Sequence, residues 1–421
     1  MNRIFLPVTL LAASGSMLLA GPLPKPDLVV AADGSGDFKT VQAAVQSIPK
    51  TNSERTVIFI KNGIYREKVR VDASFVTLRG QTRDGTRIEF LQLADDFSKN
   101  PDDLGRAVLN LNRANDVVLD NLTVENTAGV VGPHAFAMYG TGDRTVIQNC
   151  DVLSDGADTV SLWLGASGRY YHAGCRFRGS VDFVCPRGWC YVTNCSFYEM
   201  KSGSAAVWHD GSKNRDMKFV LRGCRFDGVD GWVLGRHHAD AQFYFLDCTY
   251  SRSMADKPIA RVIYPDDPQR NANLDKSNLW GEREYFYDCH RDGGDFGWFT
   301  NNLTTAPGSP RPGQISAAWT FAGTWNPEST AAPTIRHIHA SANLISVEFS
   351  ENITVRDRPR LRLDNGRMAD YTSGSGSDTL IFSLPQGQPG VVAAVDLNGG
   401  FIIASEADTT LREADLTLPT K

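Results

Sequence analysis

Short apolar runs separated by glycine, asparagine and aspartate fill the middle of this chain. Six of these runs share a pattern in which a turn-forming residue precedes a small or apolar anchor, and a valine or aromatic residue follows two positions after the anchor. The anchors are Leu122, Cys150, Cys175, Cys195, Cys224 and Cys248, so the steps between them are 28, 25, 20, 29 and 24 residues. The pattern predicts strands over residues 117–124, 145–152, 190–197 and 243–250.

A unit of 20 to 29 residues that holds several short strands is typical of one coil of a solenoid. The number of residues between anchors varies, but each anchor keeps the same place within its short strand pattern. A parallel β-helix, in which like positions of successive coils stack into interior ladders, therefore fits better than the alternatives, a β-sandwich or a propeller. We predict an all-β protein in which residues 21–327 form the parallel β-helix.

The repeat predicts where the cysteines lie in the structure. The chain has eight, and five of them occupy the anchor position. Cysteines of exported proteins are usually paired in disulfides. Five cysteines at one phase of the repeat, however, would all point into the interior, one strand spacing apart, and would act there as small buried hydrophobic residues. We therefore favour a reduced ladder over structural disulfides. Cys185 and Cys190 lie outside this phase and are the better candidates for a local bridge.

The two ends of the chain differ from the repeat. Residues 1–20 carry Arg3 and then an interrupted apolar run, which is typical of a secretory signal peptide; a buried amino-terminal helix is the alternative. Residues 328–333 have the composition of a linker. Residues 334–421 alternate apolar and polar positions between turn residues, which fits a small immunoglobulin-like β-sandwich. We interpret this second domain as a spacer or attachment module.

Charge and motifs exclude several function classes. With 48 acidic and 43 basic residues the net charge is −5, which excludes a globally basic nucleic-acid binder or a polybasic membrane protein. Residues 168–240 nevertheless contain 11 Lys/Arg and 7 Asp/Glu, which favours an acidic ligand unless this is an ordinary solvated face. The chain has no serine-esterase elbow, no zinc-protease motif and no phosphate-binding loop. We expect no cofactor and no metal.

Two aspartates remain as candidates for chemistry. Asp158 follows its anchor by 8 residues and Asp182 by 7, so a solenoid would place both on one face of consecutive coils, about 4.8 Å apart. Two carboxylates that close resist ionising together, so one stays protonated as an acid while the other is a nucleophile or base. Asp182 lies in an apolar run and needs a partner, which we expect to be Arg236. Alternatively, each aspartate caps a turn at a corner of a coil.

At these residues the chain resembles the pectinesterase (pectin methylesterase) family. The segments resemble its opening strand and cap helix, its Gly-x-Tyr-x-Glu motif, its Glu-Asn-Thr-Ala-Gly pattern, and its Gln-Asp-Thr-Leu, Gly-x-Val-Asp-Phe-Ile and Leu-Gly-Arg-Pro-Trp segments. They are, in order, residues 29–45, 63–67, 125–129, 157–160, 179–184 and 234–236. The resemblance runs from about Asp27 to Pro327. It implies a right-handed parallel β-helix, in agreement with the repeat.

The resemblance also implies a role for each catalytic candidate. Asp182 would be the nucleophile that attacks the methyl ester carbonyl. Asp158 would be the general acid that protonates departing methanol and then the base that activates water. Arg236 would orient Asp182 by hydrogen bonding. This is covalent catalysis without a serine.

The chain departs from the family at the residues expected to stabilise the oxyanion. His134 and Ala157 stand where the family has two glutamines. Ala157 has no side-chain donor, and loss of one oxyanion donor typically lowers turnover by about 10²–10³-fold. His134 can donate from a ring nitrogen, most strongly when protonated. The alternative is that His134 is a packed corner residue.

A second departure concerns sugar binding. His237 and His238 replace the Pro-Trp of the family, so one stacking surface is missing. We expect His238 to contact the substrate and Trp163, Trp208 or Trp232 to compensate with an aromatic face, unless these tryptophans belong to the core.

Together these features predict an exported esterase that demethylates pectin. The partner implied is methyl-esterified pectin or a related polyuronate, with no nucleic acid and no membrane. We expect a monomer, secreted to the extracellular space or the periplasm. One alternative is another β-helix enzyme on an acidic polysaccharide, either a calcium-dependent lyase or a glycosidase with two carboxylates. A non-catalytic glycan-binding protein is the other, motivated by His134 and Ala157.

Overall fold

The computed structural model describes residues 26–328 except 212, and residues 335–411 with gaps at 342, 357, 385–390, 397–400 and 405–408. The predicted signal peptide and residues 329–333 of the predicted linker lie outside this part. None of the helices within the described residues has the length and apolar content that a membrane span requires.

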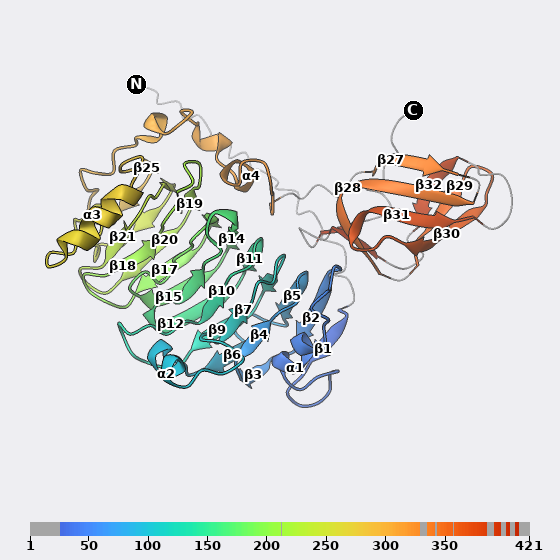
Figure 1. The fold of residues 1–421 in the computed structure, drawn as a ribbon, viewed down its shortest axis with the longest axis horizontal. Helices are drawn as coiled ribbons and strands as arrows, with labels where there is room; N and C mark the ends of the chain where they lie inside the picture. The colour runs from blue at the N-terminus through green and yellow to red at the C-terminus, as the bar shows by residue number, and fades with distance from the viewer. Residues whose placement is uncertain are drawn as a thin grey trace, which may run out of the picture.

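Three parallel β-sheets wind together through the larger part of the molecule (Figure 1). The first sheet contains β1 (Leu28–Val30), β2 (Thr56–Ile60), β5 (Val76–Gly80), β8 (Val118–Asp120), β11 (Thr145–Gln148), β14 (Arg169–Ala173), β16 (Trp189–Thr193), β19 (Phe219–Arg222), β22 (Phe243–Leu246) and β25 (Glu284–Tyr287). The second contains β3 (Gly63–Arg66), β6 (Thr86–Phe90), β9 (Thr123–Asn126), β12 (Asp151–Ala157), β15 (Arg176–Ser180), β17 (Ser196–Glu199), β20 (Arg225–Gly228), β23 (Thr249–Tyr250) and β26 (His290–Arg291).

The third sheet carries the candidate site. Its first part contains β4 (Val69–Val71), β7 (Leu109–Leu111), β10 (Met138–Gly140) and β13 (Val160–Leu162), and its second part β18 (Ala205–Trp208), β21 (Val233–His237) and β24 (Ala260–Arg261). Single bridges from Val160 to Val184 and from Val184 to Val207 join the two parts. Each sheet thus receives one strand from each successive coil, which confirms the predicted parallel β-helix.

The predicted strands were too long, because each one turns a corner. The run 145–152, for example, divides into β11 and β12. The residue before each anchor has a positive φ, a left-handed conformation that favours glycine, asparagine and aspartate. These residues are Asn121, Asn149, Gly174, Asn194, Gly223, Asp247 and, before Cys289, Asp288. The turn-forming residues of the repeat are therefore the corners of the coils.

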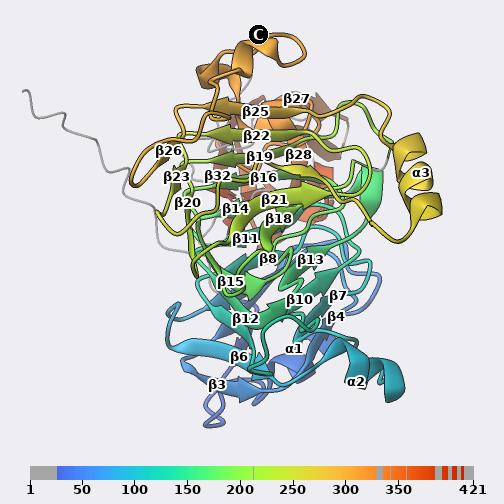
Figure 2. The ribbon, with the colours of Figure 1, turned by 90° about the vertical axis from the view of Figure 1, so that its left-hand side faces the viewer.

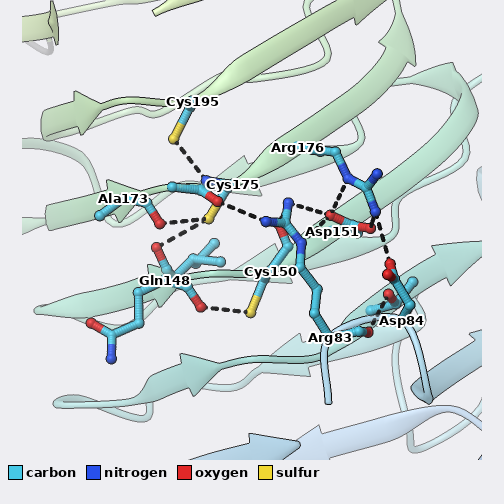
Figure 3. A network of polar contacts seen from close by, with 12 residues as sticks. Arg83, Asp84, Gln148, Cys150, Asp151, Ala173, Cys175, Arg176 and Cys195 are labelled. Atoms are coloured by element: carbon cyan, nitrogen blue, oxygen red, sulfur yellow. Dashed lines mark hydrogen bonds and ion pairs between the residues drawn. The ribbon is translucent and has the colours of Figure 1, made fainter. Parts of the chain in front are cut away.

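The anchors line the interior as predicted. All eight cysteines are free and buried. Figure 3 shows Cys175 between Cys150 and Cys195, where the Cys175 N–H donates to the Cys195 sulfur at 3.3 Å. The prediction of a bridge between Cys185 and Cys190 was wrong. The Cys185 thiol contacts Ser161 Oγ at 3.0 Å, while Cys190 lies within β16 in the core.

Helices and loops cover parts of the coil surface. Helix α1 (Val41–Gln46) is the expected cap helix, and Thr40 Oγ1 accepts from the Ala43 N–H at its start. Helices α2 (Ala94–Lys99) and α3 (Pro268–Ser277) were not expected. Neither helix buries a residue, so neither sequence shows the apolar stripe by which an amphipathic helix is predicted. Figure 2 shows α3 outside the coils, beside β18 and β21. Helix α4 (Ala317–Thr320) belongs to the expected loops that pack back on the first sheet.

An antiparallel sheet follows the β-helix. It contains β27 (Ile335–Ala340), β28 (Leu344–Arg356), β29 (Arg360–Leu363), β30 (Met368–Ser373), β31 (Ser377–Ser383), β32 (Val392–Asp396), β33 (Phe401–Ala404) and β34 (Thr409–Leu411). Its apolar side chains form a cluster separate from the β-helix core. The antiparallel strands agree with the expected second domain, and its immunoglobulin-like topology stays a prediction.

Candidate active site

The carboxylate of Asp182 is held by a strained turn. Asp182 follows β15, and both Val181 and Asp182 have positive φ, at 49° and 58°. The Asp182 N–H donates to the Ala205 carbonyl at 2.6 Å, which ties the turn to the next coil. Non-glycine residues in this conformation are costly and cluster at functional sites. The side chain is thereby held at the surface of the third sheet, although the residue is only 6% exposed.

Arg236 from β21 grips this carboxylate with two nitrogens. Arg236 Nε donates to Asp182 Oδ1 at 2.8 Å and to Oδ2 at 3.1 Å, and Nη2 donates to Oδ2 at 2.7 Å. Burial raises the pKa of Asp182, and this ion pair opposes that rise. A two-pronged guanidinium contact fixes the plane as well as the charge of a carboxylate. Asp182 is therefore oriented and stabilised in its ionised form.

Asp158 lies on the preceding coil in a different electrostatic state. It is 8% exposed and also has a positive φ of 60°. Burial, followed by the nearby charge of Asp182, raises the pKa of Asp158 to about 7. The Cys185 thiol donates to Asp158 Oδ1 at 3.6 Å. One carboxyl is thus set up to hold a proton near neutral pH while its neighbour is ionised, the division of roles that acid–nucleophile pairs need.

The exposed side chain of His134 lies next to the carboxyl group of Asp158. Its Nε2 lies 3.4 Å from Asp158 Oδ2, and its side chain is 58% exposed. His134 pairs with Ala157 through an isolated parallel bridge, so the two residues that replace the family glutamines are neighbours in space. The exposed ring shows that His134 is not a packed corner residue.

The aromatic candidates lie along the neighbouring positions of the third sheet. Trp163 is partly exposed, and its indole N–H donates to the Cys185 carbonyl at 3.0 Å. Trp208 is 5% exposed and packs edge-on against His238, with ring centroids 5.3 Å apart. Trp232 is fully buried in the core. Trp163 and His238 are therefore partly exposed, Trp208 is buried beside His238, and Trp232 belongs to the core. A sugar-binding role for Trp163, Trp208 and His238 stays a prediction.

His238 is fixed from two sides. Its backbone N–H donates to Asp210 Oδ1 at 2.9 Å, and its Nε2 forms a 2.8 Å hydrogen bond with the Tyr264 hydroxyl. Burial and the charge of Arg236 lower the pKa of His238 to about 4. The ring is neutral at ordinary pH, so His238 contributes a flat uncharged surface.

A cleft of about 370 Å³ opens beside Arg236. Its lining includes Ala205, Arg236, Lys257, Arg261 and Ile263. Because the Ala205 carbonyl accepts from the Asp182 N–H, the cleft adjoins the turn of Asp182. Cationic and apolar residues share its walls, a mixture suited to an acidic sugar with apolar ring faces.

One group of side chains among the described residues has the chemistry of a metal site. The ligand atoms of His237, Glu282 and Glu284 lie within 4.8 Å of one another. His237 Nε2 already forms a 2.8 Å ion pair with Glu282. His237 follows Arg236 in the chain, but the residue is only 1% exposed, and its ring nitrogens are engaged by the Ala239 carbonyl and Glu282.

Sequence reasoning missed two residues that contact the site. Arg187 lies between the rings of Trp163 and Trp208, and Cys185 contacts Asp158. The available signal was spacing, since both follow Asp182 within five residues in the segment Asp182-Phe-Val-Cys-Pro-Arg187.

Comparisons with known proteins show the family to which the chain belongs. A family model described as pectinesterase matches residues 27–239, which is half of the 421 residues. A pectinesterase from Petunia integrifolia is 33% identical over 198 residues, and the match covers 46% of this chain and 50% of that relative. Putative pectinesterase 11 from Arabidopsis thaliana is 31% identical over 271 residues, 62% of this chain and 70% of that relative.

Solved structures show the same fold. The pectin methylesterase PemA from Erwinia chrysanthemi matches with a TM-score of 0.58 at 19% identity, over 72% of this chain and 98% of that chain. The chain spans about half the length of the Petunia relative. Since the family model covers half of the chain and the Arabidopsis relative is matched over 70% of its length, the chain belongs to the pectinesterase family.

Proposed function

We propose that this protein hydrolyses the methyl esters of pectin and releases methanol, with Asp182 as the nucleophile. The observation that supports this most directly is the pair of buried aspartates on neighbouring coils, of which only Asp182 has a guanidinium partner at hydrogen-bond distance. Arg236 holds Asp182 at 2.7–3.1 Å, and the pKa of Asp158 is raised to about 7. Family membership supports the same reaction.

The first half of the reaction forms a covalent intermediate. An Asp182 oxygen attacks the ester carbonyl, and the negative charge moves to the carbonyl oxygen. The carbonyl then re-forms as the bond to the methoxy oxygen breaks, and Asp158 gives its proton to that oxygen, so methanol leaves. The sugar acid is now joined to Asp182 as an anhydride, and Asp158 is ionised.

The second half restores the enzyme. Asp158 takes a proton from water, the resulting hydroxide attacks the sugar carbonyl, and the bond to Asp182 breaks. Asp182 returns as a carboxylate bound by Arg236, and Asp158 is protonated again. The product leaves as a uronic acid, which releases its proton to water and becomes a uronate. His134, whose ring nitrogen lies on the open side of Asp158, is the side chain we assign to the oxyanion, because Ala157 has no donor.

Methanol release tests this proposal. Wild type and the Asp182→Asn variant would be assayed on methylated polygalacturonate, with the exposed Asp216→Asn as a matched control. We expect release by wild type and by the control, and a loss of at least about 10³-fold in Asp182→Asn. Equal release by all three proteins would contradict the mechanism. Chain shortening or an unsaturated product would instead indicate a glycosidase or a lyase, and pectin binding without release a glycan-binding protein.

We further infer that the protein acts as an exported monomer and that its antiparallel domain is an immunoglobulin-like spacer or attachment module. The interrupted apolar run of residues 1–20 and the separate apolar cluster of the second domain support this. Gel filtration and localisation of the expressed protein test it.

A further inference from the structure

The guanidinium of Arg187 is clamped between two indole rings beside the catalytic pair. Its central carbon lies 4.0 Å from the centroid of a Trp163 ring and 4.7 Å from that of a Trp208 ring. Cation–π contacts with two indole rings restrict the position of a guanidinium without using its N–H groups, which can still donate hydrogen bonds. Arg187 is thus held in one orientation before any ligand arrives.

This cation has no anionic partner in the described part of the chain. Arg187 forms no ion pair there, and its Nε is buried without a hydrogen-bond partner. Arg236, by contrast, is engaged by Asp182 on two nitrogens. A half-buried guanidinium left unpaired is costly, since it has lost part of its hydration without gaining an anion.

The position of Arg187 relates it to the substrate. Arg187 contacts the ring of Trp163, whose indole N–H donates to the Cys185 carbonyl, and the Cys185 thiol donates to Asp158 Oδ1 at 3.6 Å. Asp158 is the proposed general acid, so this short chain of contacts places the guanidinium close to the position of the reacting ester. On its other contact, Trp208 also packs against His238.

We propose that Arg187 binds the free carboxylate of a uronate unit next to the ester unit that is hydrolysed. This inference rests on the proposed function. A planar carboxylate matches the guanidinium fork and supplies the missing charge, whereas a neutral methyl ester supplies none.

Binding to oligomers of defined methylation tests the proposal. In an Asp182→Asn background, which binds without turnover, calorimetry would compare a fully de-esterified uronate hexamer with its fully methylated counterpart. We expect Arg187→Met to weaken binding of the acidic hexamer by about 10-fold or more, and binding of the methylated hexamer by less than about 3-fold. Methionine is chosen because its flexible chain refills the space between the two indoles.

Two further variants sharpen the readout. Arg187→Lys keeps the charge but lacks the planar fork of the guanidinium, so we expect its affinity for the acidic hexamer to lie between those of the parent and Arg187→Met. This variant also tests the proposal if Arg187→Met does not fold. Arg225→Met is the matched control, because Arg225 is exposed on β20 in the second sheet. Added salt should weaken binding of the acidic hexamer less in Arg187→Met than in the parent.

Equal weakening of both hexamers by Arg187→Met would overturn the proposal and leave Arg187 as a spacer between the tryptophans. That result, together with methanol release by wild type, would leave the esterase function standing. No methanol release by wild type and no binding of either hexamer would instead overturn the proposed function, and this inference with it.

Discussion

At the residue scale, the proposed chemistry depends on three side chains. Burial and the charge of Asp182 raise the pKa of Asp158 to about 7, while Arg236 keeps Asp182 ionised. The two carboxyls differ because only one has a guanidinium partner at hydrogen-bond distance. In the proposed mechanism, the same residue type therefore performs two tasks on neighbouring coils.

The pH dependence of turnover follows from Asp158. As a general acid it must be protonated, so kcat/KM should fall as the pH rises through about 7, the pKa of Asp158. The Cys185 thiol lowers this pKa by donating to Asp158, so Cys185→Ala should move the alkaline limb to higher pH. A pH–rate profile of both proteins measures this. An unmoved limb would show that Asp158 is not the group that titrates.

His134 provides a second prediction at this scale. We expect His134→Ala to lower kcat by about 10²-fold with a smaller effect on KM, because an oxyanion donor acts mainly in the transition state. His134→Gln should recover much of the loss, since the amide donates from a similar reach. The exposed His290, paired with Asp288 and Asp295, supplies the control variant His290→Ala. Full activity of His134→Ala would exclude the assigned role.

At the scale of elements, the residues at the corners of the coils determine where each strand ends and the next begins. The residue before each anchor is left-handed, so successive strands change direction without a long loop. The anchor that follows enters the interior ladder, where five cysteines and Leu122 stack. A short sequence signal thus sets both a backbone bend and a core position.

Asn194 tests this coupling between corner and core. Its φ is 52°, so Asn194→Val should destabilise the protein by about 1–2 kcal/mol, while Asn194→Gly should change stability by less than that. The midpoint of urea unfolding measures the difference. Equal midpoints for the two variants would show that the left-handed conformation of Asn194 carries no cost.

At the scale of the whole molecule, the antiparallel domain touches the β-helix near its first coils (Figure 1). The fully buried Arg55 donates its backbone N–H to Thr354 Oγ1 of β28 at 2.9 Å. Buried donors require an acceptor, so this hydrogen bond couples the two parts.

Thr354→Val removes that acceptor while keeping the shape of the side chain. We expect a loss of about 1–3 kcal/mol in stability, because the buried Arg55 N–H loses this acceptor. The thermal midpoint measures the loss, and Thr372→Val on β30 is the control. Methanol release should stay unchanged, since Thr354 lies in the other domain from Asp182. Loss of release without loss of stability would contradict this division of roles.

Patterns that repeat could be predicted, and features without a repeat could not. The repeated anchor position located the coils, because residues at the same position of successive coils must point in the same direction when the coils stack. The bridge between Cys185 and Cys190 was predicted wrongly, because distance along the chain does not show that Cys185 faces Asp158 while Cys190 faces the core. Helix α3 escaped prediction because it buries none of its residues.

The sequence by itself determined the solenoid, the corners and the trio of Asp158, Asp182 and Arg236, because these depend on local conformation and on phase along the repeat. Only the tertiary structure decided that His134 meets Asp158 and that Arg187 is clamped between Trp163 and Trp208. Those contacts join side chains from different coils. The physical reason is that the reach and direction of a long side chain depend on the neighbours stacked above and below it, which spacing along the chain does not encode.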